Sequence, residues 1–360
     1  MAAVGVADTR EQSAALAAEA RGIVKRFGPV EVLHDVAIEV PVGDARALVG
    51  RNGAGKSTLV GLLTGIYGPN AGEIRLGGKP APSLGDRQAW RERVACVYQR
   101  WMVIPHLTVG ENLFLNNHPR GALGRVDWRR LRDQAMAALK EWDLDVSPDL
   151  EAWRLTVEQR QIVEIARALL QGSRFIILDE PTAELERKEV NRLFDRIRAL
   201  QASGVTFLYI SHHLEEIYEI CRTVTVMRDG RVVANAQLQD FPKDRLVAAM
   251  VGDASVVKRE ARPAAVDAKA APGLELKGLG VAGTFEGIDL RVAAGECVGL
   301  AGLAGSGKDA VAEAVAGLLK PDSGTIEIHG RPAPAGDVEA MRAAGIGYVA
   351  RDRHVRGLFP

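Results

Sequence analysis

The stretch VGRNGAGKST, residues 49–58, decides the fold of this chain. It fits the pattern G-x-x-x-x-G-K-[ST], whose fixed positions are Gly50, Gly55, Lys56 and Ser57. The segment 45–50 before the loop predicts a strand, and 57–67 after it predicts a helix. Loop N–H groups, a helix N-terminus and a lysine in that order favour phosphate binding, and the serine hydroxyl can ligate Mg²⁺. A plain glycine-rich turn is the alternative.

The composition predicts a folded chain of about two domains. The chain has 360 residues, 47% of them apolar, with 46 basic and 46 acidic side chains. A domain of about 150 residues is typical. The zero net charge favours neither a nucleic acid nor a charged membrane surface as a partner. The three cysteines are far apart, which predicts reduced thiols and a cytosolic compartment. A membrane span needs about 18 apolar residues in a row, and no such run occurs.

The order of elements predicts an α/β core with a helical insertion. Residues 1–20 are expected to be a flexible tail, and 21–253 alternate between strand and helix patterns. Between about 100 and 170 the patterns are mostly helical. Residues 254–272 are rich in alanine, proline and charge, which predicts a linker.

Residues 273–360 repeat the beginning of the chain. At a constant offset, Gly43, Gly50, Gly53, Gly55 and Lys56 fall on Gly295, Gly302, Gly305, Gly307 and Lys308. The register needs no gap between about position 40 and Gln99, and Pro-Ala-Pro at 80–82 falls on 332–334. We therefore expect a partial second copy of the same fold, without the helical insertion and the later strands.

Two carboxylates follow the apolar segment 175–178, which predicts a buried strand. Asp179 is placed to hold Mg²⁺ through water, and Glu180 is placed to activate an attacking water. An acidic pair that merely begins a turn is the alternative, and the preceding phosphate loop argues against it.

Four stretches together resemble the ATP-binding subunits of ABC transporters. They are the phosphate loop, LTVEQRQIVEIARAL at 155–169, DEPT at 179–182 and ISHH at 210–213. VYQRWMVIPHLTVGENLFL at 97–115 and YVARDRHVRGLF at 348–359, in a duplicated chain, look like the branch of importers that takes up ribose, galactose or xylose. The resemblance covers about residues 21–360. It implies the P-loop NTPase fold of ABC ATPases.

The resemblance also implies a role for each matching position. The residues expected to hold the phosphates of ATP are Gly50, Arg51, Asn52, Gly53, Ala54, Gly55, Lys56, Ser57 and Thr58. Those expected to hold Mg²⁺ are Ser57, Gln99 and Asp179, and those expected to act in hydrolysis are Glu180 and His212. Phe27 would stack on the adenine. Three alternatives stay open: Phe27 as a core aromatic, Gln99 as an exposed loop amide, and His212 as a polar residue at a helix start.

Residues 155–159, the signature, would face the γ-phosphate of a nucleotide held by a second nucleotide-binding domain. Its expected contacts are Thr156, Glu158 and Gln159. Here Thr-Val-Glu stands where the family usually has Ser-Gly-Gly. A carboxylate 4 Å from a phosphate charge would be repelled by about 4 kcal/mol at an effective dielectric of about 20. Alternatively, Glu158 turns into solvent and favours the helix N-terminus.

The second copy departs further from the family pattern. Asp309, Arg351 and Leu279 stand where a Mg²⁺-binding hydroxyl, a glutamine and an aromatic are usual. Because ABC domains pair head to tail, the weak second phosphate loop and the weak first signature would belong to one composite site. A second signature would lie beyond Pro360, so we expect the chain as given to be truncated and a weak ATPase by itself.

The resemblance implies an ATP-hydrolysing subunit that energises a sugar-type importer. Its partners would be transmembrane permease subunits and, indirectly, an extracytoplasmic sugar-binding protein, with no nucleic acid. It would be cytoplasmic, peripheral on the inner face of the membrane. The apolar segment 101–115 is expected to dock the permease or to pack on the helical insertion. A soluble ABC-type ATPase not tied to transport and a nucleotide-binding regulatory protein are the alternative functions.

Overall fold

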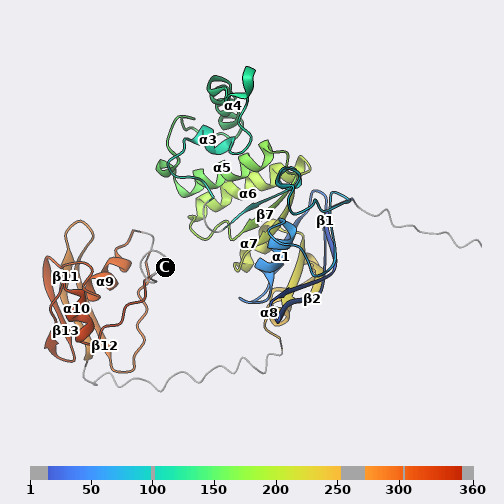
Figure 1. Ribbon diagram of the computed structural model, residues 1–360. Coiled ribbons are helices and arrows are strands. Elements are labelled where there is room, and N and C mark those ends of the chain that lie inside the picture. Colours follow the sequence, from blue (N-terminus) through green and yellow to red (C-terminus); the bar gives the residue numbers. More distant parts are fainter. Residues whose placement is uncertain (1–14, 99–101, 253–271, 303–304, 351–360) are drawn as a thin grey trace, which may run out of the picture. The chain divides into compact units, whose positions relative to one another are not determined.

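The computed structural model describes residues 15–98, 102–252, 272–302 and 305–350 (Figure 1). The chain divides into two units, 1–256 and 257–360, and each is described by itself. The predicted linker, 254–272, lies outside the described residues except for Pro272.

The first unit begins with an antiparallel sheet of order β2-β1-β4-β5. Its strands are β1 (Leu16–Phe27), β2 (Val30–Pro41), β4 (Ala71–Leu76) and β5 (Lys79–Pro80). Strand β1 begins inside the stretch 1–20, so the predicted tail was too long at that end. Residues 16–20 carry three alanines, which give no strand signal, but here they pair with β2 on one side and β4 on the other.

A second sheet of six strands, in the order β10-β9-β3-β8-β7-β6, forms the α/β core. Its strands are β3 (Ala45–Val49), β6 (Val94–Val97), β7 (Phe175–Asp179), β8 (Thr206–Ile210), β9 (Thr223–Arg228) and β10 (Arg231–Gln237). All neighbours pair in parallel except β9 and β10. The carboxyl ends of β3, β7 and β8 therefore meet at one edge, where ligands bind in open α/β sheets.

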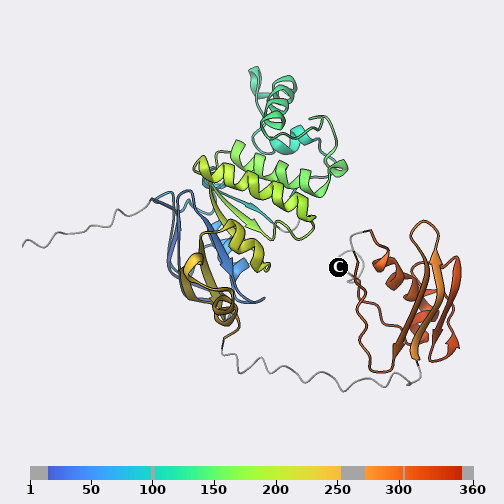
Figure 2. The ribbon, with the colours of Figure 1, turned by 180° about the vertical axis from the view of Figure 1, so that it is seen from behind.

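Helices cover both faces of the parallel sheet (Figure 2). They are α1 (Lys56–Leu63), α2 (Arg87–Arg93), α5 (Val157–Leu170), α6 (Arg187–Ala202), α7 (Leu214–Ile220) and α8 (Lys243–Val251), with the 3₁₀ turn η3 (Leu238–Asp240). Apolar residues of α1 share one core with β1 and β2. Apolar residues of α5, α6 and α7 share the other with Phe207 of β8. The predicted α/β core is confirmed.

The predicted helical insertion forms a small core of its own, drawn at the top of Figure 1. It contains α3 (Val109–Leu113) and α4 (Trp128–Glu141), the 3₁₀ turns η1 (Ala122–Gly124) and η2 (Ala152–Arg154), and one side of α5. Thr108 caps α3 and Asp127 caps α4, each accepting a hydrogen bond from a backbone N–H of the first turn. The insertion thus stacks on α5, the helix that begins in the signature.

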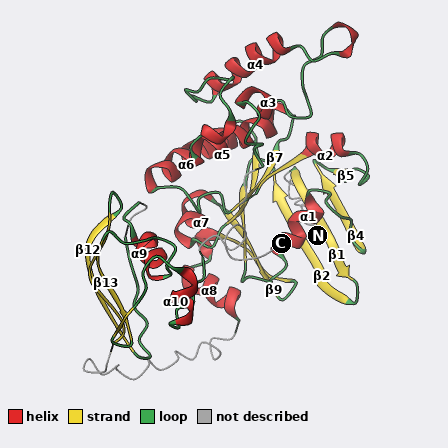
Figure 3. Ribbon diagram, turned by 60° about the vertical axis from the view of Figure 1, so that its left-hand side comes forward, coloured by secondary structure: helices red, strands yellow, loops and turns green. Residues whose placement is uncertain are grey.

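The second unit repeats the topology of the first antiparallel sheet (Figure 3). Its elements are β11 (Pro272–Val281), β12 (Phe285–Ala293), β13 (Ser323–Ile328), β14 (Arg331–Pro332), α9 (Lys308–Val315) and α10 (Val338–Ala343). The order β12-β11-β13-β14 matches β2-β1-β4-β5, which confirms a partial second copy. In its described residues, the counterparts of β3 and β6 are not strands, because a strand needs hydrogen-bonded neighbours. Val298, Leu300 and Tyr348 in these segments are more than a third exposed.

Two further features bear on the expected environment. Cys96, Cys221 and Cys297 are all free thiols. Across the ranges that the structure describes, every helix is too short or too polar to cross a membrane.

Candidate nucleotide-binding and hydrolysis site

The predicted phosphate loop connects β3 to α1 and packs tightly against neighbouring backbone. A Cβ atom at Gly50 would lie 2.3 Å from the carbonyl oxygen of Met227 in β9, so a side chain is excluded there. Gly55 has a φ of 99° and precedes the first residue of α1. Glycine adopts this left-handed conformation without steric cost, which lets the loop turn its N–H groups toward a bound anion.

Lys56 folds over the phosphate loop. Its ammonium donates hydrogen bonds to the carbonyl oxygens of Gly50 at 2.7 Å and Arg51 at 3.1 Å. Partial burial lowers the pKa of Lys56, while the nearby carboxylates of Glu180 and Asp179 raise it. The lysine is therefore held between the loop and the acidic pair, where a cation can contact a phosphate oxygen.

The acidic pair lies at the carboxyl end of β7. Asp179 pairs with Ile210 of β8, and the N–H of Glu180 donates to the Ile210 carbonyl oxygen at 2.8 Å. Glu180 has a φ of 50°, a conformation that side chains rarely adopt and that often marks a functional site. Burial, and then the Glu180 charge, raise the pKa of Asp179, while Lys56 lowers it.

His212 follows β8 and faces Glu180. The Nδ1 atom of His212 lies 3.0 Å from Oε1 of Glu180, with the histidine side chain 61% exposed and the glutamate 25% exposed. The sequence-predicted catalytic pair is thus brought together, from segments separated by a helix, at the open edge of the sheet. A water that contacts the glutamate could lose a proton to it, and the histidine could contact the phosphate.

Two predicted Mg²⁺ ligands, Ser57 and Asp179, suit that ion. Hydroxyl and carboxylate oxygens are hard ligands, and Asp179 carries a charge that burial disfavours and that a cation would stabilise. The described residues hold no cluster of three or more His, Cys, Asp or Glu that could bind a metal alone. Mg²⁺ needs no such cluster, because phosphate oxygens and water complete its shell. The third predicted ligand, Gln99, lies outside the described residues.

Phe27 ends β1 and presents an open aromatic face. Its side chain is 45% exposed, so it is not the core aromatic that the sequence left open. Its ring meets Tyr67 edge to face at 5.3 Å, and the Lys25 ammonium lies 5.1 Å from the Phe27 ring centroid. Tyr67 and Lys25 were missed in the sequence, where the only signal was an aromatic shortly after the helix of the phosphate loop.

The signature begins α5 with a complete cap. Thr156 Oγ1 accepts from the Gln159 N–H at 3.2 Å, and the Gln159 side chain accepts from the Thr156 N–H at 2.9 Å. Glu158 lies in the first turn, where an acid favours the helix dipole. It does not turn into solvent: its side chain is 15% exposed and lies 3.2 Å from Nη1 of Arg192 in α6. Arg192 had no signal in the sequence.

The chain matches the ABC transporter family model over residues 33–183 and 285–359. The chain belongs to the ABC transporter family. The first match lies in the first unit and the second match in the second unit, in agreement with the internal repeat.

Curated relatives and solved structures agree with this assignment. The chain is 41% identical over 345 residues to a ribose import ATP-binding protein of Rubrobacter xylanophilus, covering 95% of this chain and 68% of the relative. It is 40% identical over 341 residues to one of Streptomyces coelicolor, covering 94% and 66%. A solved nucleotide-free ATP-binding cassette from an ABC transporter matches with a TM-score of 0.56 and 25% identity, covering 68% of this chain and 98% of that one. The chain spans about two thirds of the length of the two ribose import ATP-binding proteins.

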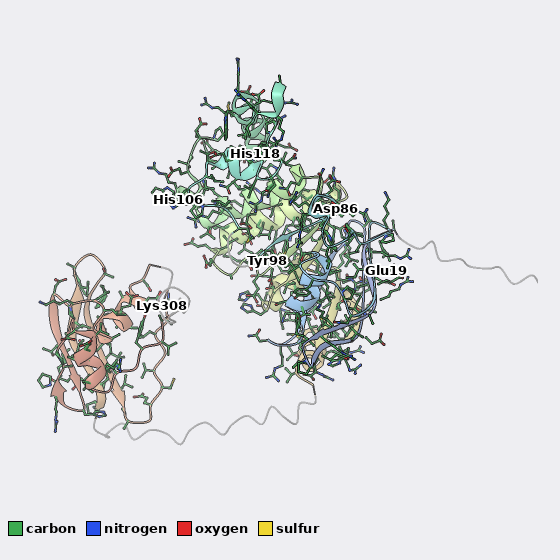
Figure 4. The ribbon with its side chains drawn as sticks, viewed as in Figure 1. Glu19, Asp86, Tyr98, His106, His118 and Lys308 are labelled. Carbon is green, nitrogen blue, oxygen red and sulfur yellow. The ribbon has the colours of Figure 1, made fainter. Side chains whose placement is uncertain are left out.

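The predicted ABC-type ATPase is therefore confirmed, and its second unit retains part of the same site. Lys308 Nζ donates to the Gly302 carbonyl oxygen at 3.0 Å, as Lys56 does to Gly50, and Figure 4 labels Lys308 in the second unit. Asp309 occupies the first turn of α9, at the position of Ser57. Leu279 is fully buried, so it offers no stacking face. Arg351 lies outside the described residues.

Lys56, which lies between the phosphate loop and the acidic pair, should contribute directly to the affinity for ATP. Lys56→Ala should weaken ATP binding to the ABC ATPase roughly 10-fold to 100-fold, the effect of losing a charge-assisted hydrogen bond of about 1.5–3 kcal/mol. Calorimetric titration of the full chain with ATP measures the change. Lys188→Ala, an exposed lysine of α6, is the control and should bind as the wild type does. Equal affinity in wild type and Lys56→Ala would contradict the assignment.

Proposed function

We propose that this chain is the ATP-hydrolysing subunit of a sugar importer, coupled to a separate transmembrane permease. One observation carries the proposal: the phosphate loop, Asp179, Glu180 and His212 converge at one sheet edge. The relatives named above are ribose import ATP-binding proteins, which supports a sugar as the transported solute. The protein would work on the inner face of the membrane, with an extracytoplasmic sugar-binding protein as its indirect partner.

The reaction would be ATP plus water to ADP plus phosphate. In this assignment the backbone of residues 50–58 and Lys56 hold the phosphates, and Phe27 stacks on the adenine. Ser57, Gln99 and Asp179 would hold Mg²⁺, which supplies charge neutralisation on the transferred phosphate. Glu180 accepts the proton of the attacking water, and His212 orients Glu180 and the γ-phosphate.

The signature would close over a nucleotide bound by a second nucleotide-binding domain. The acid at Glu158 is compatible with this role because Arg192 is close enough to compensate its charge. Because Arg192 is 62% exposed, solvent screens this ion pair, which stabilises the fold by at most about 1 kcal/mol, so its main effect would be on the local field.

Permease docking is proposed for the segment that follows Gln99. Glu164 of α5 accepts a hydrogen bond from the Met102 N–H, and Arg167 donates to the Met102 carbonyl oxygen at 3.3 Å. The Met102 side chain is 53% exposed and Ile104 is 41% exposed, whereas Val103 is buried in the core of the insertion. The segment thus packs on the insertion and also presents apolar groups; Trp101 lies outside the described residues. The segment is hydrogen-bonded to α5, the helix that begins in the signature. A permease docked on this segment would therefore be connected to the part of the domain that faces ATP.

Glu180→Gln tests the catalytic assignment. In the assembled complex it should slow phosphate release roughly 100-fold or more, because the amide cannot accept a proton, while ATP binding persists. Glu184→Gln, an exposed residue of the same turn region, should have the wild-type rate. An undiminished rate for Glu180→Gln would place the base elsewhere.

Two single variants, one at each partner of the Glu158–Arg192 ion pair, should change ATPase turnover in opposite directions if Arg192 compensates the Glu158 charge. Arg192→Gln should lower ATPase turnover of the assembled complex several-fold, because the Glu158 charge is then uncompensated near phosphate. Glu158→Gln should leave turnover unchanged or raise it, and the double variant should regain the wild-type rate. Arg187→Gln breaks a similar ion pair of α6, with Glu219, and is the control. Equal losses in both single variants would mean that the pair merely joins two helices.

Docking can be tested with two methionines of equal exposure. Met102→Cys should cross-link to the permease under turnover conditions. Met136→Cys, on α4 and also 53% exposed, should cross-link far less, because it lies on another part of the insertion. The measurement is the yield of cross-linked species on a denaturing gel. Similar yields at both positions would contradict a docking surface at Met102.

A further inference from the structure

The buried carboxylate of Glu216, which was not among the predicted site residues, contacts both the turn after Glu180 and the residue before His212. Glu216 of α7 is 8% exposed. Its Oε2 atom accepts hydrogen bonds from the hydroxyls of Thr182 at 2.6 Å, Tyr209 at 2.8 Å and Ser211 at 3.3 Å. All three donors are themselves buried, so a single carboxylate oxygen accepts hydrogen bonds from three buried hydroxyls.

The donors flank the catalytic pair. Thr182 lies in the turn that follows Glu180, and Ser211 directly precedes His212. Tyr209 lies in β8, paired with Leu178 of β7. Ser211 Oγ also accepts from the His213 N–H at 3.0 Å, so it links the carboxylate to the backbone on the far side of His212.

The chemistry of this cluster makes it rigid. Hydrogen bonds to a charged acceptor are stronger than neutral ones, and a buried network holds its members in one arrangement only when every member has a partner. Burial, followed by the neighbouring Glu216 charge, raises the pKa of Tyr209 well above its usual range, so the phenol stays protonated and donates. Packing of α7 does not require this acid, because Ile217 and Ile220 already bury the helix in the apolar core.

We propose that Glu216 is a positioning residue for hydrolysis, which holds the turns of Glu180 and His212 at the separation seen here. The inference rests on the proposed function, since it assigns a role in the same reaction. The Glu180 N–H bond to Ile210 fixes the backbone at the strand ends, but the His212 side chain is largely exposed and the turn after Glu180 continues beyond that bond. The Glu216 carboxylate adds a second constraint, because its bonds to Thr182 and Ser211 join both turns to one helix.

The test uses the full chain assembled with its permease, with kcat, KM for ATP and Tm measured together. Glu216→Gln should lower kcat about 10-fold or more and leave KM within about 2-fold, because the phosphate loop is untouched. Thr182→Val should lower kcat in the same direction, and Thr182→Ser, which keeps the hydroxyl, should rescue it. In a His212→Ala background, Glu216→Gln should lower kcat by a smaller factor than in the wild type, because one of the two residues it positions is gone.

A second buried pair provides the matched control. Thr223 Oγ1 donates to Asp44 at 2.6 Å at the opposite, amino-terminal edge of the same sheet. Thr223→Val should lower Tm by an amount similar to Thr182→Val and leave kcat unchanged. The proposal is overturned if Glu216→Gln retains the wild-type kcat, or if kcat falls equally in Thr182→Val and Thr223→Val. Failure of the proposed function itself would look different, since Glu180→Gln would then also leave turnover unchanged.

Discussion

The parallel pairing of β7 with β8, beside β3, is the constraint on which the site depends. It places the residues that follow three strands at one edge, although they are far apart along the chain. Asp179 ends one strand, His212 follows the next, and the phosphate loop follows the third. A shift of register between β7 and β8 would separate Glu180 from His212, because the backbone bond from Glu180 to Ile210 sets their relative height.

Electrostatics at this edge reinforce the geometry. Lys56 lies within the field of Glu180 and Asp179, which raise its pKa, and burial raises the pKa of Asp179. A site with such unbalanced, partly desolvated charge is suited to a ligand that completes it. Glu158 differs, because Arg192 lies close enough to compensate its charge within the protein.

The two units show how strongly sheets depend on their neighbours. Both contain the antiparallel sheet with the same strand order, since each of those strands finds its partners within the first part of the repeat. Among the described residues, the parallel sheet lies in the first unit, where β7, β8 and β9 supply its paired strands. In the described second unit, the segments equivalent to β3 and β6 contain apolar residues but form no strand, and Val298, Leu300 and Tyr348 are exposed.

The sequence by itself determined the α/β class, the helical insertion and the repeat, and it predicted the candidate catalytic residues of the first unit. Glycines, a lysine and acids at strand ends follow local rules that can be read along the chain. The sequence misplaced the start of β1, since pairing with two strands outweighs the weak propensity of alanine. Only the tertiary structure decided that Arg192 meets Glu158, that Tyr67 and Lys25 adjoin Phe27, and that Glu216 collects three hydroxyls. Such contacts join distant segments through side-chain packing, and no spacing along one chain encodes them.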